Sequence, residues 1–329
     1  MEYRLIGKTG LKVSCLALGT DNFADPTPEK ESAMILESSI DSGINLIDTG
    51  DVYADGEGEK IIGRTLKNSK KRDQVLIATK VDHGKRRPGY SIDDPALSGP
   101  NDHGHSRLNI IRACENSLKR LQTDYIDIYQ LHTPQPNWPI EDTMSELVKL
   151  KQEGKILHIG LSNYSVEETI SATACTSIQS SQPRYNLIFN NEEKATLEFC
   201  YQNGLGIMAH SVLAKGLLTG KYKAGHIFEE DDERRLFNFF RGTLFDVINK
   251  LVQELNGWAI ERNRNVTQLA IAWVLAQRPV TSAIVGMKTL EQVEQARLSS
   301  EWNLTQSELG EVSNILGTFK PKWVKDPVS

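Results

Sequence analysis

Short continuous apolar runs, rather than alternating ones, recur along the whole chain of 329 residues. A strand that is covered on both faces has this pattern, because neither face meets water. The runs predict eight strands, near residues 15–19, 45–48, 75–80, 124–131, 157–161, 177–182, 206–210 and 283–286.

Between these runs, apolar residues recur at helical spacing, which predicts helices with one buried face. The helices are expected over residues 29–42, 58–67, 107–121, 140–153, 166–174, 192–203 and 245–277, the last with a break near Asn263. A hairpin is expected before the first run, around Lys8 and Gly10. Eight strands that alternate with helices suit a closed (β/α)8 TIM barrel, whose active site lies at the C-terminal face.

Two connections are longer than usual for such a barrel. They run from Val81 to Ser106, after the third strand, and from Lys221 to Gly242, after the seventh. Loops of this length in a compact domain usually carry function. We therefore expect long active-site loops at the C-terminal face.

Composition is that of an ordinary globular chain, with 39% hydrophobic and 25% charged residues. No shift in composition and no Ser-, Gly- or Pro-rich linker divides it, so residues 1–329 are expected to form a single domain. The chain starts without a basic region followed by an apolar core, and no apolar run approaches the ~20 residues of a membrane span. This favours a soluble cytoplasmic protein without a membrane partner.

Two classes of ligand are disfavoured. The net charge of −5 argues against a nucleic-acid partner, because phosphate binding needs concentrated Lys and Arg. The four cysteines lack metal-ligand spacing, which argues for reduced thiols. His83, His103 and His105 in the first long loop open the alternative of a metal site, but no carboxylate stands at a typical ligand spacing. We expect no metal.

Polar residues follow three of the apolar runs, where strands of a barrel end at its C-terminal face. Asp48 ends the second run and Tyr53 follows it, Lys80 ends the third, and His132 follows the fourth. Taken singly, each residue is more often structural than catalytic. Their joint occurrence at neighbouring strand ends predicts a common site.

These four side chains are suited to protonating a carbonyl oxygen while a hydride arrives from elsewhere. A tyrosine, with an ordinary pKa near ~10, needs a nearby cation to act as an acid at neutral pH. Lys80 can lower the pKa of Tyr53, and Asp48 can hold the ammonium in place. His132 can donate a hydrogen bond to the substrate oxygen.

Several motifs join these residues along the chain: Asp48-Thr-x-x-x-Tyr53, Thr79-Lys80, Gln130-Leu-His132, Gly160-Leu-Ser-Asn-Tyr164, Gln182-Pro-Arg-Tyr-Asn186 and Ser211-x-Leu-x-x-Gly216-Leu-Leu-Thr-Gly-Lys221-Tyr. In order and spacing they resemble the aldo-keto reductases over nearly the whole chain. The opening Tyr-Arg-x-Ile-Gly-x-Thr-Gly-Leu-x-Val-Ser and the ending Ile284-Val-Gly-Met-Lys288 are similar to the branch of bacterial general and sugar reductases and potassium-channel β subunits.

The resemblance implies a nicotinamide dinucleotide across the barrel mouth, and the absence of a Gly-x-Gly-x-x-Gly after the first strand argues against a Rossmann site. Four groups of residues match the family's cofactor contacts. Those near the nicotinamide are Gly19, Thr20, Asp21 and Asp48, and those at its carboxamide are Ser162, Asn163 and Gln182. The nicotinamide platform and pyrophosphate loop are His210, Ser211, Val212, Leu213, Lys215, Gly216 and Lys221, and the segment for the adenosine 2′-phosphate is Gly286, Lys288, Gln292 and Gln295.

Three positions depart from the family pattern. His210 stands where relatives place Tyr, Phe or Trp to stack on the nicotinamide, Val212 replaces the usual Pro, and Ala296 the usual Asn. Lys288 favours NADPH, but these departures leave NADH possible. Imidazole can stack, although it buries less area than indole.

The resemblance thus implies reversible NADPH-dependent reduction of an aldehyde or ketone, such as a sugar or related small carbonyl compound. The expected substrate contacts are Asn22, Phe23, Tyr53, His132 and Trp138. The alternative is a slow-turnover nicotinamide-binding regulatory subunit. An unrelated barrel hydrolase or isomerase would need a second carboxylate or a metal. The oligomeric state stays open.

Overall fold

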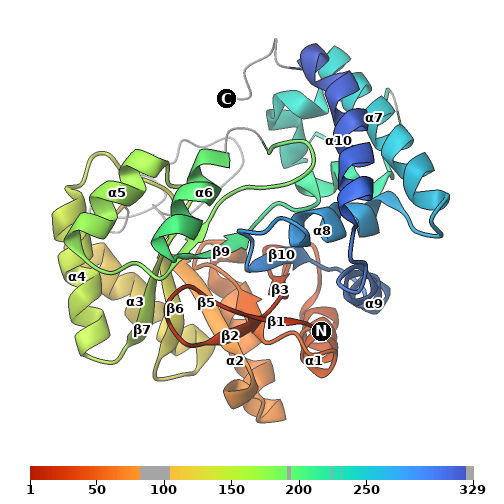
Figure 1. The fold of residues 1–329 in the computed structure, drawn as a ribbon. Helices are drawn as coiled ribbons and strands as arrows, with labels where there is room; N and C mark the ends of the chain where they lie inside the picture. Colours follow the sequence, from red (N-terminus) through yellow and green to blue (C-terminus); the bar gives the residue numbers. More distant parts are fainter. Residues whose placement is uncertain (82–103, 191–193, 224, 231, 324–329) are drawn as a thin grey trace.

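Eight parallel strands close into a barrel in the computed structural model, which describes residues 1–81, 104–190, 194–223, 225–230 and 232–323. Each strand pairs with the next along the chain, and the circle closes where residues 283–286 lie opposite residues 16–19 (Figure 1). The predicted barrel is confirmed. Its strands are β3 Leu16–Gly19, β4 Leu46–Asp48, β5 Leu76–Val81, β6 Ile126–Leu131, β7 Ile156–Ser162, β8 Ser180–Gln182, β9 Gly206–Ala209 and β10 Ser282–Gly286.

Helices surround the barrel where the described chain crosses from one strand to the next (Figure 1). The expected break near Asn263 is confirmed, because Asn265 caps a new helix by accepting a hydrogen bond from the Gln268 amide. The helices are α1 Glu29–Asp41, α2 Glu57–Ser69, α3 Arg107–Leu121, α4 Ile140–Gln152, α5 Val166–Cys175, α6 Lys194–Asn203, α7 Gly242–Ile260, α8 Val266–Leu275, α9 Leu290–Ser299 and α10 Gln306–Trp323.

Helix α10 is absent from the sequence-based prediction and packs along α7 (Figure 1). Its sequence contains Gly310, Gly317 and Pro321, which are poor residues for a helix interior. Val312 and Leu316 are buried in this packing. Tertiary contact therefore stabilises a helix that local preference disfavours.

The predicted N-terminal hairpin is present as the antiparallel pair β1 Tyr3–Leu5 and β2 Lys12–Ser14. Its turn lies against the N-terminal ends of β8 and β9. Gly7 has φ +54°, and a Cβ there would lie 2.4 Å from the Gln179 carbonyl oxygen. Only glycine permits this close approach. The hairpin thus closes one end of the barrel and leaves the C-terminal end for the site.

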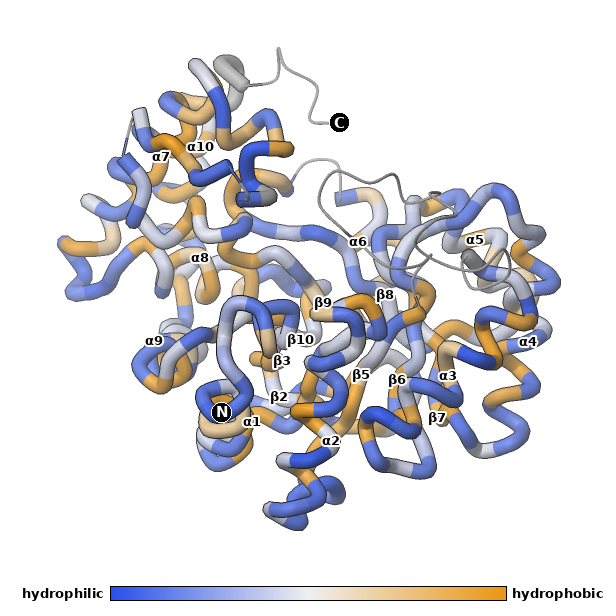
Figure 2. The backbone as a smooth tube through the Cα atoms, turned by 180° about the vertical axis from the view of Figure 1, so that it is seen from behind, coloured by the Kyte–Doolittle hydropathy of each residue, from blue (hydrophilic) through white to orange (hydrophobic). Residues whose placement is uncertain are grey.

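Two apolar clusters form the core of the described residues. The larger one fills the space between the strands and the surrounding helices. Figure 2 shows hydrophobic segments along the strands and parts of the helices, while many connecting loops are hydrophilic. The smaller cluster fills the barrel interior above the hairpin and consists of Ile6, Val13, Ala17, Leu46, Ala78, Ile128, Met208 and Ile284.

The two long loops differ in how far the structure describes them. Residues 82–103 of the first loop lie outside the described part of the chain, and His83 and His103 lie with them. The second loop contains the short helical turns η4 Glu233–Leu236 and η5 Asn238–Phe240. Within the described ranges, no helix has both the length and the apolar character needed to cross a lipid bilayer.

Candidate active site

A buried lysine forms the centre of a polar cluster at the C-terminal ends of β4 and β5. Lys80 Nζ donates to Asp48 Oδ2 at 2.7 Å, to the Thr49 carbonyl oxygen at 2.8 Å and to the Tyr53 hydroxyl oxygen at 3.2 Å. The Lys80 side chain has no exposed surface. A buried ammonium is tolerated when it is paired and its protons are hydrogen-bonded, and Lys80 meets both conditions.

Local backbone geometry brings Tyr53 back over the end of β4. Tyr53 begins a short helical turn, η1 Tyr53–Gly56, in which Ala54 and Asp55 have φ of 48° and 55°. A Cβ on Gly50 would lie 3.4 Å from the Tyr53 ring. Left-handed backbone at non-glycine residues is unfavourable, and it is common at sites where a side chain must be aimed.

The second oxygen of Asp48 is held by two glutamines. Gln182 Nε2 donates to Asp48 Oδ1 at 2.7 Å, and Gln130 Nε2 lies 3.5 Å from the same oxygen. Gln182 Nε2 also lies 3.2 Å from Gln130 Oε1. The structure therefore connects Gln182, which was expected at the cofactor carboxamide, to Asp48 as well. Gln130 was not predicted as a site residue. A glutamine within an apolar strand was a usable signal in the sequence, because a buried amide needs hydrogen-bond partners. The structure shows that Gln130 is fully buried.

His132 follows β6 and faces Tyr53. The ring centroids of His132 and Tyr53 are 6.0 Å apart, with the rings nearly perpendicular at 79°. The His132 amide donates to the Val81 carbonyl oxygen at 3.1 Å, which ties the residue to the end of β5. The structure thus brings together all four residues that the sequence predicted as catalytic.

Burial dominates the protonation of this cluster. It raises the pKa of Tyr53 to about 12, because the downward effect of the Lys80 charge is outweighed by desolvation and by Asp48 and Asp21. Burial alone would lower the pKa of Lys80, but Asp48 and Tyr53 raise it above its ordinary value. Lys80 is therefore charged and Tyr53 protonated at neutral pH. The expected effect of Lys80 on Tyr53 is present, but the net shift is upward.

His210 and Asn163 form a second polar group beside the first. Ring atoms Nε2 and Nδ1 of His210 lie 2.8 Å from Asn163 Oδ1 and 2.9 Å from Ser211 Oγ. Asn163 Nδ2 donates to the His132 carbonyl oxygen at 3.0 Å and to Ser162 Oγ at 3.1 Å. Burial, with the charge of Lys80, lowers the pKa of His210 to about 3, so its imidazole is neutral.

A cavity of about 830 Å³ opens over both polar groups. Tyr53, His132, Asn163 and His210 line it. Its charged lining residues are Asp21, Glu168, Arg184 and Lys215, and its aromatic wall contains Phe189, Phe237 and Phe239. The volume is in the range of small-molecule and cofactor sites.

Positive charge gathers beside this cavity from the second long loop, which contains Lys221 and Arg234, and from Lys288 after β10. Burial and the charge of Arg234 lower the pKa of Lys221. Burial, Lys221 and Arg234 lower the pKa of Lys288, against the opposite effect of Asp21. A Cβ on Gly216 would lie 3.2 Å from Lys221 Nζ. Mutually repelling cations around a glycine-containing loop fit a multiply charged anion such as a dinucleotide phosphate.

Arg234 was not predicted, because it lies within the second long loop, where charged residues are frequent. Its Nε donates to Asp232 Oδ1 at 2.7 Å, and its guanidinium lies 5.2 Å from the Phe228 ring centroid. These contacts hold the charge in place. Only the folded loop brings it near Lys221 and Lys288.

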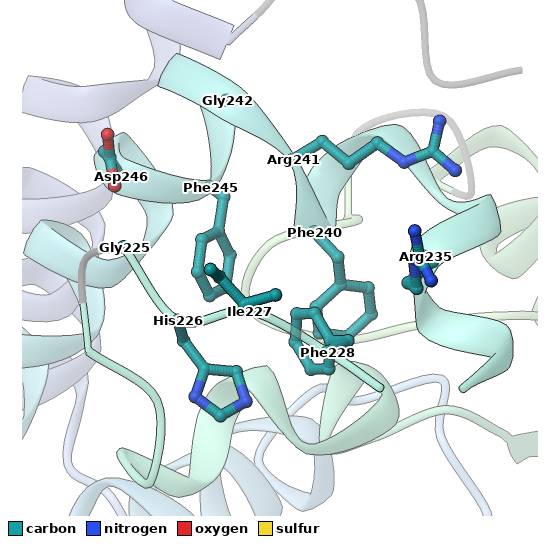
Figure 3. Close-up of a pocket in the computed structure, with 10 residues that line it drawn as sticks. All are labelled: Gly225, His226, Ile227, Phe228, Arg235, Phe240, Arg241, Gly242, Phe245 and Asp246. Atoms are coloured by element: carbon teal, nitrogen blue, oxygen red, sulfur yellow. The ribbon is translucent and has the colours of Figure 1, made fainter. Parts of the chain in front are cut away.

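A smaller hollow of about 450 Å³ lies on the same loop (Figure 3). Phe228, Phe240 and Phe245 gather at its centre, and their rings contact one another at centroid distances of 5.1 to 6.2 Å. Arg235 and Arg241 lie at its rim. This aromatic packing joins the loop to α7 and so supports the neighbouring Arg234.

Other predicted cofactor residues lie around the barrel mouth. Thr20 Oγ1 donates to the Asp48 carbonyl oxygen at 2.9 Å, and a Cβ on Gly286 would lie 3.2 Å from Asp21 Oδ1. Gly19 pairs with Gly286 across β3 and β10. The remaining members lie as follows: Ser162 ends β7, Val212 is buried, Leu213 precedes the turn Ala214–Thr219, Gln292 accepts from the Lys288 amide at 2.7 Å, and Gln295 lies on α9.

Ala296, one of the three departures, is buried in the larger apolar cluster. An asparagine there would have to place a polar amide in that packing or turn it toward the surface. The structure therefore gives Ala296 a packing role.

Three expected substrate contacts lie outside the described lining of the large cavity. Phe23 has no exposed surface and belongs to the core. Asn22 is buried and donates to Thr27 Oγ1 at 2.8 Å and to the Met287 carbonyl oxygen at 3.0 Å. Trp138 packs so closely on Gly104 that a Cβ there would lie 2.2 Å from its ring. The pattern of strand ends did not separate these packing roles from cavity walls, so the proposed site excludes Asn22, Phe23 and Trp138.

His105 is buried, and its carbonyl oxygen accepts a hydrogen bond from Thr143 Oγ1 at 3.2 Å. Within the described ranges, no group of three His, Cys, Asp or Glu side chains is arranged to hold a metal ion. The other two histidines of the suggested cluster, His83 and His103, lie outside those ranges.

Comparison with known proteins relates this geometry to one family. The model of the aldo/keto reductase family matches residues 15–316. Aldo-keto reductase YhdN of Bacillus subtilis (strain 168) is 34% identical over 336 residues, which cover 100% of this chain and 96% of that protein. A probable voltage-gated potassium channel subunit beta of Arabidopsis thaliana is 32% identical over 309 residues, with 90% of each chain covered. The solved structure of the glycerol dehydrogenase AKR11B4 from Gluconobacter oxydans has a TM-score of 0.85 at 30% identity and covers 99% of this chain and 97% of its own.

Proposed function

This chain belongs to the aldo/keto reductase family, and on that basis we propose that it reversibly reduces an aldehyde or ketone to the alcohol with NADPH. The observation that carries the proposal is the position of Lys80, whose Nζ joins Asp48 at 2.7 Å to the Tyr53 hydroxyl at 3.2 Å. This triad opens into a cavity that His132 also lines. Family membership supports an oxidoreductase of carbonyl compounds; the cofactor and the residue roles are our proposal.

Tyr53 acts as the general acid in the direction of reduction and gives its phenolic proton to the carbonyl oxygen. Lys80 stabilises the phenolate that remains, and Asp48 keeps the ammonium charged and in place. His132 donates a hydrogen bond to the same carbonyl oxygen and positions it. Proton transfer by a positioned side chain typically contributes about 10²- to 10⁴-fold to the rate.

A nicotinamide cofactor fits the residues around the cavity. Bound there in its reduced form, it would supply the hydride for the carbonyl carbon. Asn163 Oδ1 keeps one lone pair beside its bond to His210 and can accept from the carboxamide, which needs both donors and acceptors. Ser162 and Gln182 add hydroxyl and amide groups. The phosphates would be held by Lys215, Lys221, Arg234 and Lys288, with close backbone approach at Gly216.

We infer a preference for NADPH over NADH from Lys288. Its pKa is lowered by burial and by Lys221 and Arg234, so an additional phosphate would relieve repulsion that the unliganded protein bears.

We propose a small carbonyl compound as the substrate. The cavity lining combines polar residues such as Ser165 and Thr196 with phenylalanine rings, and this mixture suits a sugar or related polyhydroxy compound. The similarity to a glycerol dehydrogenase supports a polyhydroxy substrate as well. We propose a cytoplasmic location, in keeping with NADPH-dependent reduction.

A slow-turnover regulatory subunit is the second candidate. Similarity to a probable potassium channel subunit beta supports it, as does His210 in place of a larger aromatic platform. It differs from the first candidate in one measurable respect, since the nucleotide would bind tightly while turnover stays negligible.

The test is a fluorescence titration with NADPH and NADH, followed by nucleotide oxidation with a panel of aldehydes, ketones and aldoses. Tight NADPH binding with brisk turnover is expected. Tight binding without turnover across the panel would favour the regulatory subunit, and no binding of either nucleotide would overturn both candidates.

The Tyr53→Phe variant tests the assignment of the acid. It keeps the ring and removes the proton, so kcat is expected to fall by about 10²- to 10⁴-fold while NADPH still binds. Tyr3→Phe, which removes a hydroxyl from the hairpin at the opposite end of the barrel, is the matched control. Near-normal kcat in Tyr53→Phe would contradict the mechanism.

A further inference from the structure

The hydrogen bonds of His210 define its tautomer. Asn163 Nδ2 must point to the His132 carbonyl oxygen and Ser162 Oγ, because a carbonyl oxygen can only accept. Asn163 Oδ1 therefore faces His210 Nε2 at 2.8 Å, and this nitrogen must carry the proton. His210 Nδ1 is then the acceptor of the Ser211 hydroxyl at 2.9 Å. Both ring nitrogens are engaged in the neutral form.

Asn163 is held at several points. Its backbone is left-handed, with φ +60°, and its amide donates to the Gln182 carbonyl oxygen at 3.1 Å. Asparagine tolerates this conformation better than most residues. Its side-chain amide then reaches the main chain of His132, whose ring faces Tyr53 at 6.0 Å. A continuous chain of contacts thus runs from the His210 ring to the acid–base centre.

We propose that His210 is a positioning residue, which acts through the Asn163 amide to hold His132 in place opposite Tyr53. This inference rests on the proposed function and deepens it. It assigns to His210 a role in the reduction step in addition to that of a flat surface under the nicotinamide. The arrangement depends on histidine, because phenylalanine at this position has no donor for Asn163 Oδ1 and the hydroxyl of tyrosine lies farther from its backbone.

Two substitutions separate the hydrogen bond from the ring. His210→Phe keeps a flat ring and removes the donor, whereas His210→Gln keeps an N–H donor and removes the ring. If His210 positions His132, Phe lowers kcat by about tenfold, the effect of one lost hydrogen bond, while NADPH affinity is retained. At saturating NADPH, Gln is expected to keep more of kcat than Phe does, although it binds NADPH more weakly. If His210 serves only as a flat surface under the nicotinamide, the kcat of His210→Phe is instead expected to equal or exceed that of the wild type.

A double-mutant cycle tests whether the effect passes through Asn163. His210→Phe is compared in the wild-type and Asn163→Ala backgrounds, and the loss of kcat is expected only where Asn163 is present. Equal losses in both backgrounds would overturn the proposed path.

Nuclear magnetic resonance of the unliganded protein gives a readout independent of turnover. The His210 ring is expected as the Nε2–H tautomer, and the His132 ring signals are expected to shift in His210→Phe and to return in His210→Gln. An Nδ1–H tautomer of His210 would overturn the inference, and so would His132 ring signals that are unchanged in both variants. Failure of the proposed function can be distinguished from failure of this inference. A wild-type protein that neither binds a nucleotide nor turns over substrate would still show the link between His210 and His132 in its unliganded spectra.

Discussion

Lys80 is a charged side chain without exposed surface, so its three hydrogen-bond partners decide whether the charge is tolerated. Asp48 supplies the compensating charge. In such a pair, loss of one member is more harmful than loss of both, because a single buried charge remains uncompensated. The same property makes the pair suitable for holding a proton donor beside it.

The Lys80→Met variant is therefore expected to destabilise the fold by about 3–5 kcal/mol, since it leaves Asp48 buried without its cation. The double variant Asp48→Asn with Lys80→Met removes both charges and is expected to be more stable than Lys80→Met alone. Urea unfolding of the wild type, the single variant and the double variant measures the differences in the free energy of unfolding. A double variant as unstable as the single one would show that the charge pair is not the cause.

The shifted pKa of Tyr53 makes stability depend on pH in one direction. Its pKa is raised to about 12, mainly by burial. In an unfolded chain the group titrates near ~10, so its contribution to stability is complete below that pH and is lost as the pH rises toward the folded value. In the free enzyme we expect no phenolate of Tyr53 between pH 6 and 9, roughly the range where ordinary tyrosine is also protonated.

An ultraviolet titration of wild type and Tyr53→Phe measures this. The difference between the two should appear only near the raised pKa of about 12. A phenolate signal at neutral pH would mean that the Lys80 charge outweighs burial.

At the scale of elements, the hairpin and the barrel depend on each other through a close contact. Gly7 and Gly10 both lie in its turn with positive φ, of +54° and +79°. An added Cβ at Gly7 would meet the Gln179 carbonyl oxygen at 2.4 Å, whereas at Gly10 nothing lies within 4 Å. The two positions share the backbone strain but differ in the clash.

Gly7→Ala is therefore expected to cost about 1–3 kcal/mol more stability than Gly10→Ala, the usual cost of overpacking. Thermal or urea unfolding of both variants isolates the clash from the strain. Equal losses would indicate that the hairpin can shift away from β8 and β9 without cost.

At the scale of the whole molecule, the cations beside the cavity come from two distant parts of the chain. Lys221 begins the second long loop and Arg234 lies within it, whereas Lys288 follows β10. Their mutual repulsion is visible in the lowered pKa values of Lys221 and Lys288, for which burial is the larger cause. Closure of the barrel, which places β9 beside β10, is what brings them together.

Lys288→Gln is expected to weaken NADPH binding by about ten- to a hundredfold, the effect of losing a charge-assisted contact, and to change NADH binding less. Lys12→Gln, an exposed lysine on β2 at the opposite end of the barrel, is the control. Fluorescence titration with both nucleotides measures the ratio. Equal weakening for NADPH and NADH would place Lys288 elsewhere than at the additional phosphate.

The sequence by itself determined the eight strands, the hairpin and the four residues at the strand ends. Continuous apolar runs report burial on both faces, and a parallel barrel brings the ends of its strands to one face whatever the details of packing. Asp48, Lys80 and His132 stand directly at those ends, and Tyr53 follows one of them closely. Their meeting was therefore predictable.

Tertiary structure decided the features that depend on distance and burial. Arg234 joins Lys221 and Lys288 only when the loop folds, and Phe23 belongs to the core although it follows a strand. The Tyr53 pKa rises, because desolvation outweighs a single neighbouring cation. A sequence records which groups are present, whereas their hydration and mutual distances arise only when segments far apart along the chain pack together.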